Sequence, residues 1–336
     1  MITYKTDIFT GLRATSGITI GNLIGSIDQI VKLVESGEYG RPMVFVADMH
    51  SLTNNEAGDT QQYVIPVLKD CVAAGLDLDS LDIFVQSQIA NEIGKMSLYL
   101  SRLITVAELM RVPTLKEKLK VNQSEENANA LLLLYPVMMA SDILLQKSMF
   151  VPVGKDQEAH LEVTCDLANR FNKRYGDILP LPKPIKQGES INILSLKGDG
   201  TKMSKSDPSG AIILDDDIDI SLAKVKKAKT AFEGEMSDEL SSLIEILEFV
   251  GSKEQIDEGK RIVGEHMDGK AVMGEFKGVL IDALEVFLKD FQSKKSSITD
   301  DSIMKHLKVG AQIARERAQE TLKEVEDAMG MEFVGV

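Results

Sequence analysis

Apolar residues in the first two hundred positions fall into two alternating kinds of segment. Short apolar runs of strand length are separated by longer stretches in which apolar residues recur every three or four positions, the spacing of an amphipathic helix. Because strands and helices alternate regularly, we expect an α/β fold built on a doubly wound parallel sheet. Strands are predicted at 9–13, 42–48, 81–85, 150–153 and 191–196, with a proline-rich connection at 176–187. Helices are predicted at 18–34, 61–74, 94–120, 127–146 and 158–175, with Pro113 breaking the third.

The pattern changes after residue 214, where the strand and glycine signals fade and helical spacing continues. A chain of 336 residues exceeds the length at which a single hydrophobic core keeps growing. We therefore predict two domains, an α/β domain over 1–214 and a helical domain over 215–336. The helices of the second domain are predicted at 221–231, 238–250, 253–266, 270–289 and 299–329.

Composition adds constraints on class and compartment. An apolar content of 43% with 27% charged residues describes a globular protein rather than a disordered one. Cys71 and Cys165 lack the spacing of metal ligands, which favours free thiols in a reducing cytoplasm. The chain opens without the apolar segment of a signal peptide, and its longest apolar run, 131–140, is too short to span a bilayer. We therefore expect a cytoplasmic protein with no membrane partner.

The net charge bears on binding of nucleic acid. The formal charge is −14, and residues 211–336 carry 17 basic and 27 acidic side chains. Such a surface argues against general nucleic-acid binding, whose affinity comes mainly from phosphate neutralisation, so we expect no DNA partner. A local basic patch could still contact one RNA. Its densest candidate is the cluster Lys224, Lys226, Lys227 and Lys229, for which a solvated helix face is the simpler interpretation.

The segment after the first predicted strand has the pattern of a phosphate-binding turn. Ile18-Thr-Ile-Gly-Asn-Leu-Ile-Gly25 opens a helix, and a helix start that follows a strand directs free N–H groups at an anion. Gly21 would let a nucleotide approach the backbone, and Thr19 and Asn22 could donate hydrogen bonds to phosphates. The alternative is that Thr19 and Asn22 only cap the helix.

A second candidate for phosphate chemistry is a loop bracketed by Gly198 and Gly210. It carries Lys202 and Lys205, three residues apart, with hydroxyl side chains around them. Glycines let such a loop move, and mobile ammonium groups suit the charge that develops on a leaving polyphosphate. The alternative is a solvated basic turn, and the phosphate interpretation needs a second phosphate site elsewhere in the fold.

Two further side chains stand where a ligand cleft is expected. His50 follows the predicted strand 42–48, and parallel strands deliver side chains to a cleft at their carboxyl ends. Asp142 lies inside the apolar helix 127–146, where a carboxylate is costly unless it is paired. A structural role is the alternative for each residue. The sharper interpretation makes Asp142 the acceptor for a single donor on an apolar ligand.

The end of the strand 150–153 offers another polar cluster. Gly154, Asp156 and Gln157 stand between this strand and the start of the next helix. That geometry suits ribose hydroxyls and an ammonium group. The alternative is that Asp156 caps the helix, and one carboxylate cannot easily fill both roles.

Two motifs stand in the right order and context for one activity, Thr-Ile-Gly-Asn at 19–22 and Lys-Met-Ser-Lys-Ser at 202–206. Together they resemble the HIGH and KMSKS motifs of class I aminoacyl-tRNA synthetases, and TIGN is a variant familiar from bacterial tryptophanyl-tRNA synthetases. The resemblance extends through 135–145, 151–157 and 161–172, and more weakly through the helical part. It implies a Rossmann-like catalytic domain with an appended α-helical domain.

The resemblance implies a two-step reaction and an amino-acid site. The carboxylate of tryptophan attacks the α-phosphorus of ATP, giving tryptophanyl-adenylate and pyrophosphate, and the terminal ribose of the tRNA then takes the aminoacyl group. By resemblance Asp142 accepts from the indole N–H. Tyr135 and Gln157 bind the amino group, and His50 lies near the carboxylate. The implied apolar walls are Phe9, Met139, Val151 and Val153.

The resemblance also implies an ATP site. Lys202 and Lys205, with Thr19 and Asn22, take the catalytic roles, and Mg²⁺ shares the negative charge of the phosphates. Lys118 is a possible third cation. Further nucleotide contacts are implied for Arg13, Ala14, Thr15, Gly21, Gly154, Lys155, Asp156, Ile193, Met203, Ser204 and Ser206.

The implied partners are L-tryptophan, ATP and tRNA(Trp). The family also leads us to expect a homodimer whose contact surface lies in the helices around 60–145, with the insertion at about 90–145 forming the interface. The helical domain 215–336 would bind the anticodon, and the loop 198–210 would move during the reaction.

Departures from the family pattern and rival functions remain. The usual Gln-Pro-Ser-Gly turn is Arg13-Ala-Thr-Ser16 here, and the usual Gly-Glu-Asp-Gln is Gly154-Lys-Asp-Gln157. A tyrosyl-tRNA synthetase is the rival within the class, and it typically has Gln where this chain has Met139. A non-catalytic paralogue that binds tryptophan or tRNA, and a nucleotidyl-transferring ligase for another acid, are rivals from other classes.

Overall fold

The computed structural model describes residues 4–14, 17–53, 60–121, 129–154, 158–186 and 191–331. Within these residues the core is a sheet of five parallel strands in the order β3-β2-β1-β4-β5. The order runs outward in both directions from β1, so the sheet is doubly wound and the predicted fold class is confirmed. The strands are β1 (Thr6–Leu12), β2 (Met43–Val46), β3 (Asp82–Val85), β4 (Ser148–Val153) and β5 (Lys183–Lys186).

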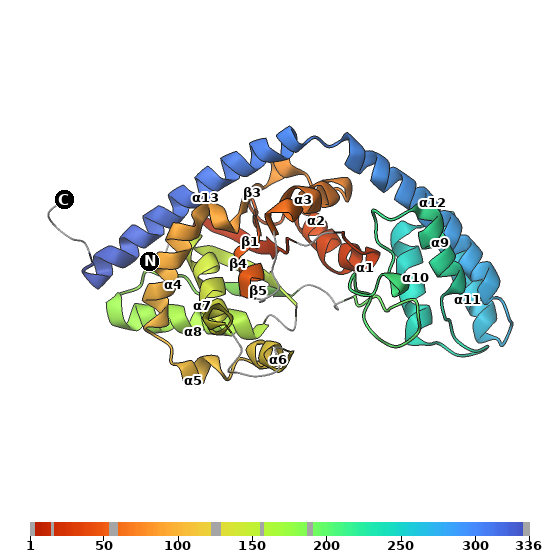
Figure 1. The fold of residues 1–336 in the computed structure, drawn as a ribbon, viewed down its shortest axis with the longest axis horizontal. Coiled ribbons are helices and arrows are strands. Elements are labelled where there is room, and N and C mark those ends of the chain that lie inside the picture. Colours follow the sequence, from red (N-terminus) through yellow and green to blue (C-terminus); the bar gives the residue numbers. More distant parts are fainter. Residues whose placement is uncertain are drawn as a thin grey trace.

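Helices bury both faces of this sheet. Val44 of β2 packs into one hydrophobic cluster and Phe45 into another, because successive side chains of a strand point to opposite faces. Helices α2 and α3 contribute to the first cluster, and α4, α7 and α8 to the second (Figure 1). The helical segments of this part are α1 (Ile20–Asn22), η1 (Leu23–Ile27), α2 (Asp28–Glu35), η2 (Met49–Thr53), η3 (Thr60–Tyr63), α3 (Val64–Ala73), η4 (Leu78–Ser80), η5 (Gln86–Ile89), α4 (Ala90–Ser101), α5 (Val106–Leu109), α6 (Pro113–Val121), α7 (Ala130–Leu145), α8 (Glu158–Tyr175) and η8 (Pro208–Gly210).

Four helices form a compact group at one end of the molecule (Figure 1). They are α9 (Ile218–Lys227), α10 (Asp238–Val250), α11 (Lys253–Met267) and α12 (Met273–Ser297). Serine side chains cap the starts of α10 and α11, where they accept from backbone N–H groups. Their buried apolar side chains belong to the first hydrophobic cluster, so this group and the sheet share one core. None of the described helices has both the length and the apolarity needed to cross a bilayer.

The last helix, α13 (Asp300–Met329), leaves this group and runs back along the α/β part (Figure 1). It crosses the sheet at β3, since Leu307 belongs to the cluster on one face and Ala314 to the cluster on the other. Gly310 makes the crossing possible, because a β-carbon there would overlap the backbone of Ile83. The predicted helical domain 215–336 therefore includes a helix, α13, that packs on the strands of the α/β part. Helical spacing shows that a helix buries one side, but it does not show against which partner.

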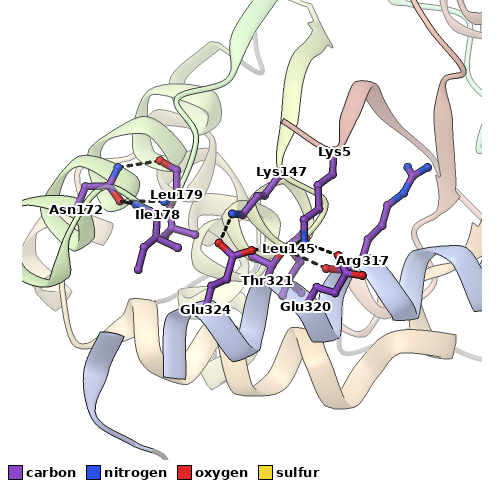
Figure 2. Close-up of polar contacts among 10 residues, drawn as sticks. All are labelled: Lys5, Leu145, Lys147, Asn172, Ile178, Leu179, Arg317, Glu320, Thr321 and Glu324. Atoms are coloured by element: carbon purple, nitrogen blue, oxygen red, sulfur yellow. Dashed lines mark hydrogen bonds and ion pairs between the residues drawn. The ribbon is translucent and has the colours of Figure 1, made fainter. Parts of the chain in front are cut away.

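Polar contacts fix α13 below the amino ends of the strands (Figure 2). Glu320 pairs with Lys5 at 2.8 Å and Glu324 with Lys147 at 2.5 Å. The hydroxyl of Thr321 donates to the carbonyl of Leu145 at 2.8 Å. Lys147 is buried and has a φ of 44°, so an ion pair with α13 holds a residue in the left-handed region that usually takes glycine.

Two sequence-based assignments near the site are wrong. No strand forms at 191–196, where only Leu194 makes an isolated bridge with Lys202. The fifth strand is instead β5, inside the predicted proline-rich connection. Proline lacks a backbone N–H and is tolerated at a sheet edge, which is the place of β5. Pro113 does not break a helix but begins α6, where its missing N–H costs no hydrogen bond.

Candidate active site

The central strand of the sheet carries an exposed residue near its carboxyl end. Gly11 of β1 is exposed, although both its neighbours in the chain are buried. A β-carbon at this position would lie 2.8 Å from the ring of Phe45, so any other residue would require that ring to shift. Exposure in a central strand requires an opening above the sheet. The opening lies at the carboxyl ends of the strands, where open α/β sheets bind their ligands.

The lysine loop is joined to the start of α1 by backbone hydrogen bonds. The N–H of Met203 donates to the carbonyl of Ile193 at 2.8 Å, which closes the loop on itself. The segment that follows the loop pairs with the helix start, since Ile20 donates to Ile212 at 2.9 Å and Leu214 to Ile18 at 3.0 Å. The two motifs that are far apart in the sequence therefore meet at one place.

The side chain of Lys205 lies beside the turn that precedes α1. A β-carbon on Gly17 would lie 3.4 Å from the Lys205 Nζ atom, and Gly17 has a φ of +59° that favours glycine. Lys202 is exposed on the same loop. The hydroxyls of Ser204 and Ser206 are 2.8 Å apart. The loop thus places an ammonium group next to the helix start, as a shared polyphosphate site requires.

Thr19 and Asn22 form the cap of α1. The Thr19 hydroxyl accepts from the backbone N–H of Asn22 at 3.1 Å and donates to its amide oxygen at 2.9 Å. Thr19 is buried and Asn22 is exposed. The proton of Thr19 is committed to Asn22, so the group that can face a phosphate is the Asn22 amide nitrogen, a donor. Their catalytic roles stay predictions, with Thr19 positioning Asn22.

Gly21 packs against the base of the lysine loop, and its contact with a nucleotide stays a prediction. Gly21 is buried, and a β-carbon there would lie 3.3 Å from Cβ of Ile193 and 3.6 Å from Cβ of Met203. Both residues are buried, at 0% and 3% exposure. The missing side chain of Gly21 therefore admits the base of the lysine loop. The backbone contact of Ile193 with adenine stays a prediction.

Two cations approach the opening from other elements. Arg13 is an exposed residue just after β1. Lys118 of α6 lies 4.0 Å from the centre of the Tyr135 ring. Burial lowers the pKa of the Lys118 ammonium, and the neighbouring charge of Arg13 lowers it further. Two like charges held near each other, one of them partly desolvated, favour binding of an anion between them.

Asp142 of α7 is the buried carboxylate of the site. It is 2% exposed, and burial raises its pKa, while hydrogen bonds from His50 and Gln86 act in the opposite direction. His50 Nε2 is 3.0 Å from Oδ2, and Gln86 Nε2 lies 3.0 Å from Oδ1 and 2.8 Å from Oδ2. A carboxylate offers about four lone pairs, so these donors leave capacity for one more.

Gln86 is a site residue that the sequence analysis misses. It is fully buried at the carboxyl end of β3, and its amide oxygen accepts from the backbone N–H of His50 at 3.3 Å. The rule that selects His50, a polar residue directly after a buried parallel strand, would also have selected Gln86. Asp48, after β2, accepts from the backbone N–H of Ser87 at 3.0 Å and so fixes the segment that carries Gln86.

Tyr135 of α7 also lies in a polar cluster that the sequence does not predict. Its hydroxyl is 2.8 Å from His160 Nε2 and 2.9 Å from the hydroxyl of Thr114. Tyr135 and His160 are almost completely buried. The apolar spacing of α8 gives no sign that a histidine on this helix reaches α7.

Three of the four predicted apolar walls, Phe9, Val151 and Val153, belong to the hydrophobic cluster on the second face of the sheet. Phe9, Val151 and Val153 are buried and Met139 is partly buried. Phe9 stacks on Phe45 with ring centres 4.8 Å apart and planes inclined by 11°. Phe45, which lies against Gly11, therefore extends the aromatic surface of Phe9 below the opening. Nothing in the sequence pattern singles out Phe45.

The remaining predicted residues divide into two groups. Ala14 is buried after β1, and Gly154 directly follows β4. Thr15, Lys155, Asp156 and Gln157 lie outside the described residues. Among the residues that are described, no three His, Cys, Asp or Glu side chains cluster as metal ligands.

Comparison with known proteins decides the family. The model of the class I tRNA synthetases for tryptophan and tyrosine (W and Y) matches residues 3–289. A tryptophan–tRNA ligase from Rickettsia bellii is 34% identical over 97% of this chain and 99% of its own. The chain belongs to the tryptophanyl-tRNA synthetases. A second relative, the tryptophan–tRNA ligase of Caldanaerobacter subterraneus, is 33% identical over 96% of this chain and 98% of its own.

Solved structures of this family have the same fold. The tryptophanyl-tRNA synthetase of Campylobacter jejuni, complexed with ADP and tryptophan, matches with a TM-score of 0.80 and 26% identity, over 97% of this chain and all of that one. The enzyme of Mycoplasma pneumoniae matches with a TM-score of 0.81 and 28% identity, over 97% and 98% of the two chains. The resemblance noted from the two motifs is confirmed at the level of the family.

Proposed function

We propose that this tryptophanyl-tRNA synthetase activates L-tryptophan with ATP and transfers it to tRNA(Trp). A carboxylate oxygen of tryptophan forms a bond to the α-phosphorus, and the bond from that phosphorus to the bridging oxygen breaks, which releases pyrophosphate. The 3′-terminal ribose of the tRNA then attacks the carbonyl carbon and releases AMP. The observation that carries the proposal is the meeting of the lysine loop with the start of α1. A buried carboxylate, Asp142, lies at the same carboxyl edge of the sheet, where it contacts the residues that follow β2 and β3.

Activation needs positioning and charge stabilisation rather than a protein nucleophile. The negative charge that moves onto pyrophosphate is met by Lys205 and Lys202, and Arg13 and Lys118 are two further cations for it. Asn22 donates from the helix start. Mg²⁺ bound to the phosphates would share their charge, while these residues would hold the triphosphate in place.

Selection of the amino acid rests on the acceptor Asp142. Indole has one N–H donor and is otherwise apolar, so it fits a slot with one free acceptor position and apolar walls. A phenol can both donate and accept a hydrogen bond. The thioether of Met139 has no proton to donate, so it would leave the phenol oxygen without a partner. Tyr135 then takes the ammonium group, together with Gln157.

The tRNA and a second copy of the chain complete the proposed assembly. The helices α9–α12 would contact the anticodon, while the α/β part with α13 holds the catalytic site, in a cytoplasmic setting. The proposed dimer surface is formed by α4, α5 and α7, which expose Leu98, Val106 and Leu134 at 73%, 62% and 40%. Sedimentation of wild type and L98E tests it, since an interfacial charge would yield monomers and an unchanged mass would contradict this surface.

ATP–pyrophosphate exchange with each aromatic amino acid tests the reaction. We expect exchange with tryptophan that exceeds exchange with tyrosine or phenylalanine by at least about 10³-fold. Phenylalanine leaves the buried acceptor without a donor, and the hydroxyl oxygen of tyrosine would be buried without a donor of its own. The chain contains no tryptophan, so a bound substrate is the only indole emitter in a fluorescence titration. Tryptophan binding without exchange would instead identify a non-catalytic paralogue.

A further inference from the structure

A triangle of polar atoms joins three helices on the second face of the sheet. Thr114 of α6 and Tyr135 of α7 both reach Nε2 of His160 on α8, at 2.7 and 2.8 Å, and the two hydroxyls are 2.9 Å from each other. The rings of Tyr135 and His160 meet edge to face with centres 5.3 Å apart. The proposed function uses Tyr135 and gives no role to the other two residues.

The number of protons in this triangle decides what the Tyr135 oxygen can present to a ligand. Each hydroxyl has one proton, and Nε2 of a neutral imidazole has either a proton or a lone pair. With a lone pair on Nε2, one hydroxyl donates to it and the other donates to the first hydroxyl. Both protons are then used inside the triangle, and the Tyr135 oxygen has only lone pairs left. With a proton on Nε2, one hydroxyl proton is released and Tyr135 can turn outward as a donor.

We propose that His160, through an unprotonated Nε2, is a positioning residue that keeps the Tyr135 hydroxyl an acceptor for the α-ammonium group of the substrate. The inference rests on the proposed function, which assigns that group to Tyr135. An ammonium has three donors and no acceptor, so it binds an oxygen that only accepts and is opposed by one that donates. His160 therefore contributes to discrimination between tryptophan and indole compounds that lack an ammonium group.

Two ligands separate this role from a structural one. Tryptophan and indole-3-propionate share the indole and the carboxylate, but only tryptophan has the ammonium, and both fluoresce against a chain without tryptophan residues. We expect H160M, which replaces the imidazole by an apolar side chain of similar size, to weaken tryptophan binding about 10- to 100-fold, the range for a hydrogen bond to a charged group. Binding of indole-3-propionate should change less than about twofold. H160Q, whose amide oxygen can accept in place of Nε2, should restore most of the loss.

A double-mutant cycle with Tyr135 completes the test. In a Y135F background the acceptor is already absent, so H160M should add no further loss of tryptophan affinity. An equal loss for both ligands, or a full loss from H160M in the Y135F background, would overturn the proposal. Nitrogen-15 NMR of the four histidines, assigned with H160Q, should show the shift of an unprotonated Nε2 for His160. If wild type itself fails to prefer tryptophan over indole-3-propionate, the assignment of the ammonium fails, and with it that part of the proposed function.

Discussion

Lys295, near the end of α12, forms an ion pair with Asp70, a residue of α3 that is only 1% exposed. The same ammonium group lies 2.6 Å from Asp215, just after the segment that pairs with the start of α1. The amide of Gln292 on α12 donates to the carbonyl of Leu214 at 2.8 Å. One turn of α12 therefore connects the helical group to the backbone that supports the proposed phosphate site.

The Asp70 carboxylate gives this joint a pH dependence. Burial raises its pKa to about 6, against the effect of Lys295, whereas an unfolded aspartate titrates near 3.9. The folded protein therefore binds a proton between about pH 4 and pH 6 that the unfolded chain does not bind. The free energy of unfolding should fall by up to about 3 kcal/mol as the pH rises through this window, and no further above it.

Urea denaturation of wild type and D70N between about pH 4 and pH 7 measures this effect. D70N lacks the titrating group, so the stability of wild type relative to D70N should decline from pH 4 to pH 6 and then stay level. Parallel curves for the two proteins would show that Asp70 does not titrate in this range.

The carboxylate of Asp142 predicts a pH dependence of substrate binding rather than of stability. Its pKa is raised by burial, and Gln86 lowers it by donating to both oxygens. Replacing Gln86 by methionine removes that stabilisation of the charged form, so the pKa should rise further. Because the protonated acid is a poorer acceptor, tryptophan affinity should fall on acidification, and in Q86M this fall should occur at a higher pH.

A fluorescence titration at several pH values compares the two midpoints. D142A is the matched control, since it should lose selectivity among aromatic amino acids and the pH response attributable to this group. Equal midpoints in wild type and Q86M would show that Gln86 does not lower the pKa of Asp142.

Lys205 should act on the rate of activation more than on binding of the amino acid. The developing charge on pyrophosphate is greatest in the transition state, and loss of one well-placed charged donor costs about 10²- to 10³-fold in rate. K205A should therefore slow adenylate formation by about this factor and change the dissociation constant of tryptophan less than about threefold. Pre-steady-state formation of adenylate, with K253A on the exposed start of α11 as control, gives the comparison. A proportional loss of rate and affinity would exclude a transition-state role.

Replacing Gly310 by alanine should change the free energy of unfolding in the direction opposite to the one that helix propensity predicts. In an exposed helix, glycine to alanine stabilises by up to about 1 kcal/mol. At Gly310 the added carbon would overlap the backbone of Ile83, so G310A should destabilise by about 1–3 kcal/mol, the usual cost of overpacking. G278A, in α12 with no atom within 4 Å of the added carbon, is the matched control and should be neutral or stabilising. Thermal unfolding of both variants gives the sign directly.

The sequence predicts those features of the site that depend on local pattern. Helical and strand periodicity gives the alternation of elements, and a carboxylate on an apolar helix marks Asp142. What the pattern does not contain is the partner across space. His50, Gln86 and Asp142 come from three separate elements, and only the sheet order brings them together. Likewise, α13 has the spacing of any amphipathic helix, and its position on β3 depends on Gly310, which in sequence terms is only an unfavourable helix residue.

The route of α13 limits how this polypeptide can be divided. A fragment that ended at the close of α12 would keep every residue assigned here to ATP and tryptophan. It would also leave the backbone of β3 without its cover and strip Lys5 and Lys147 of their counterions. The half of the molecule that performs the chemistry is thus not a self-sufficient module, and its integrity depends on the final thirty-residue helix.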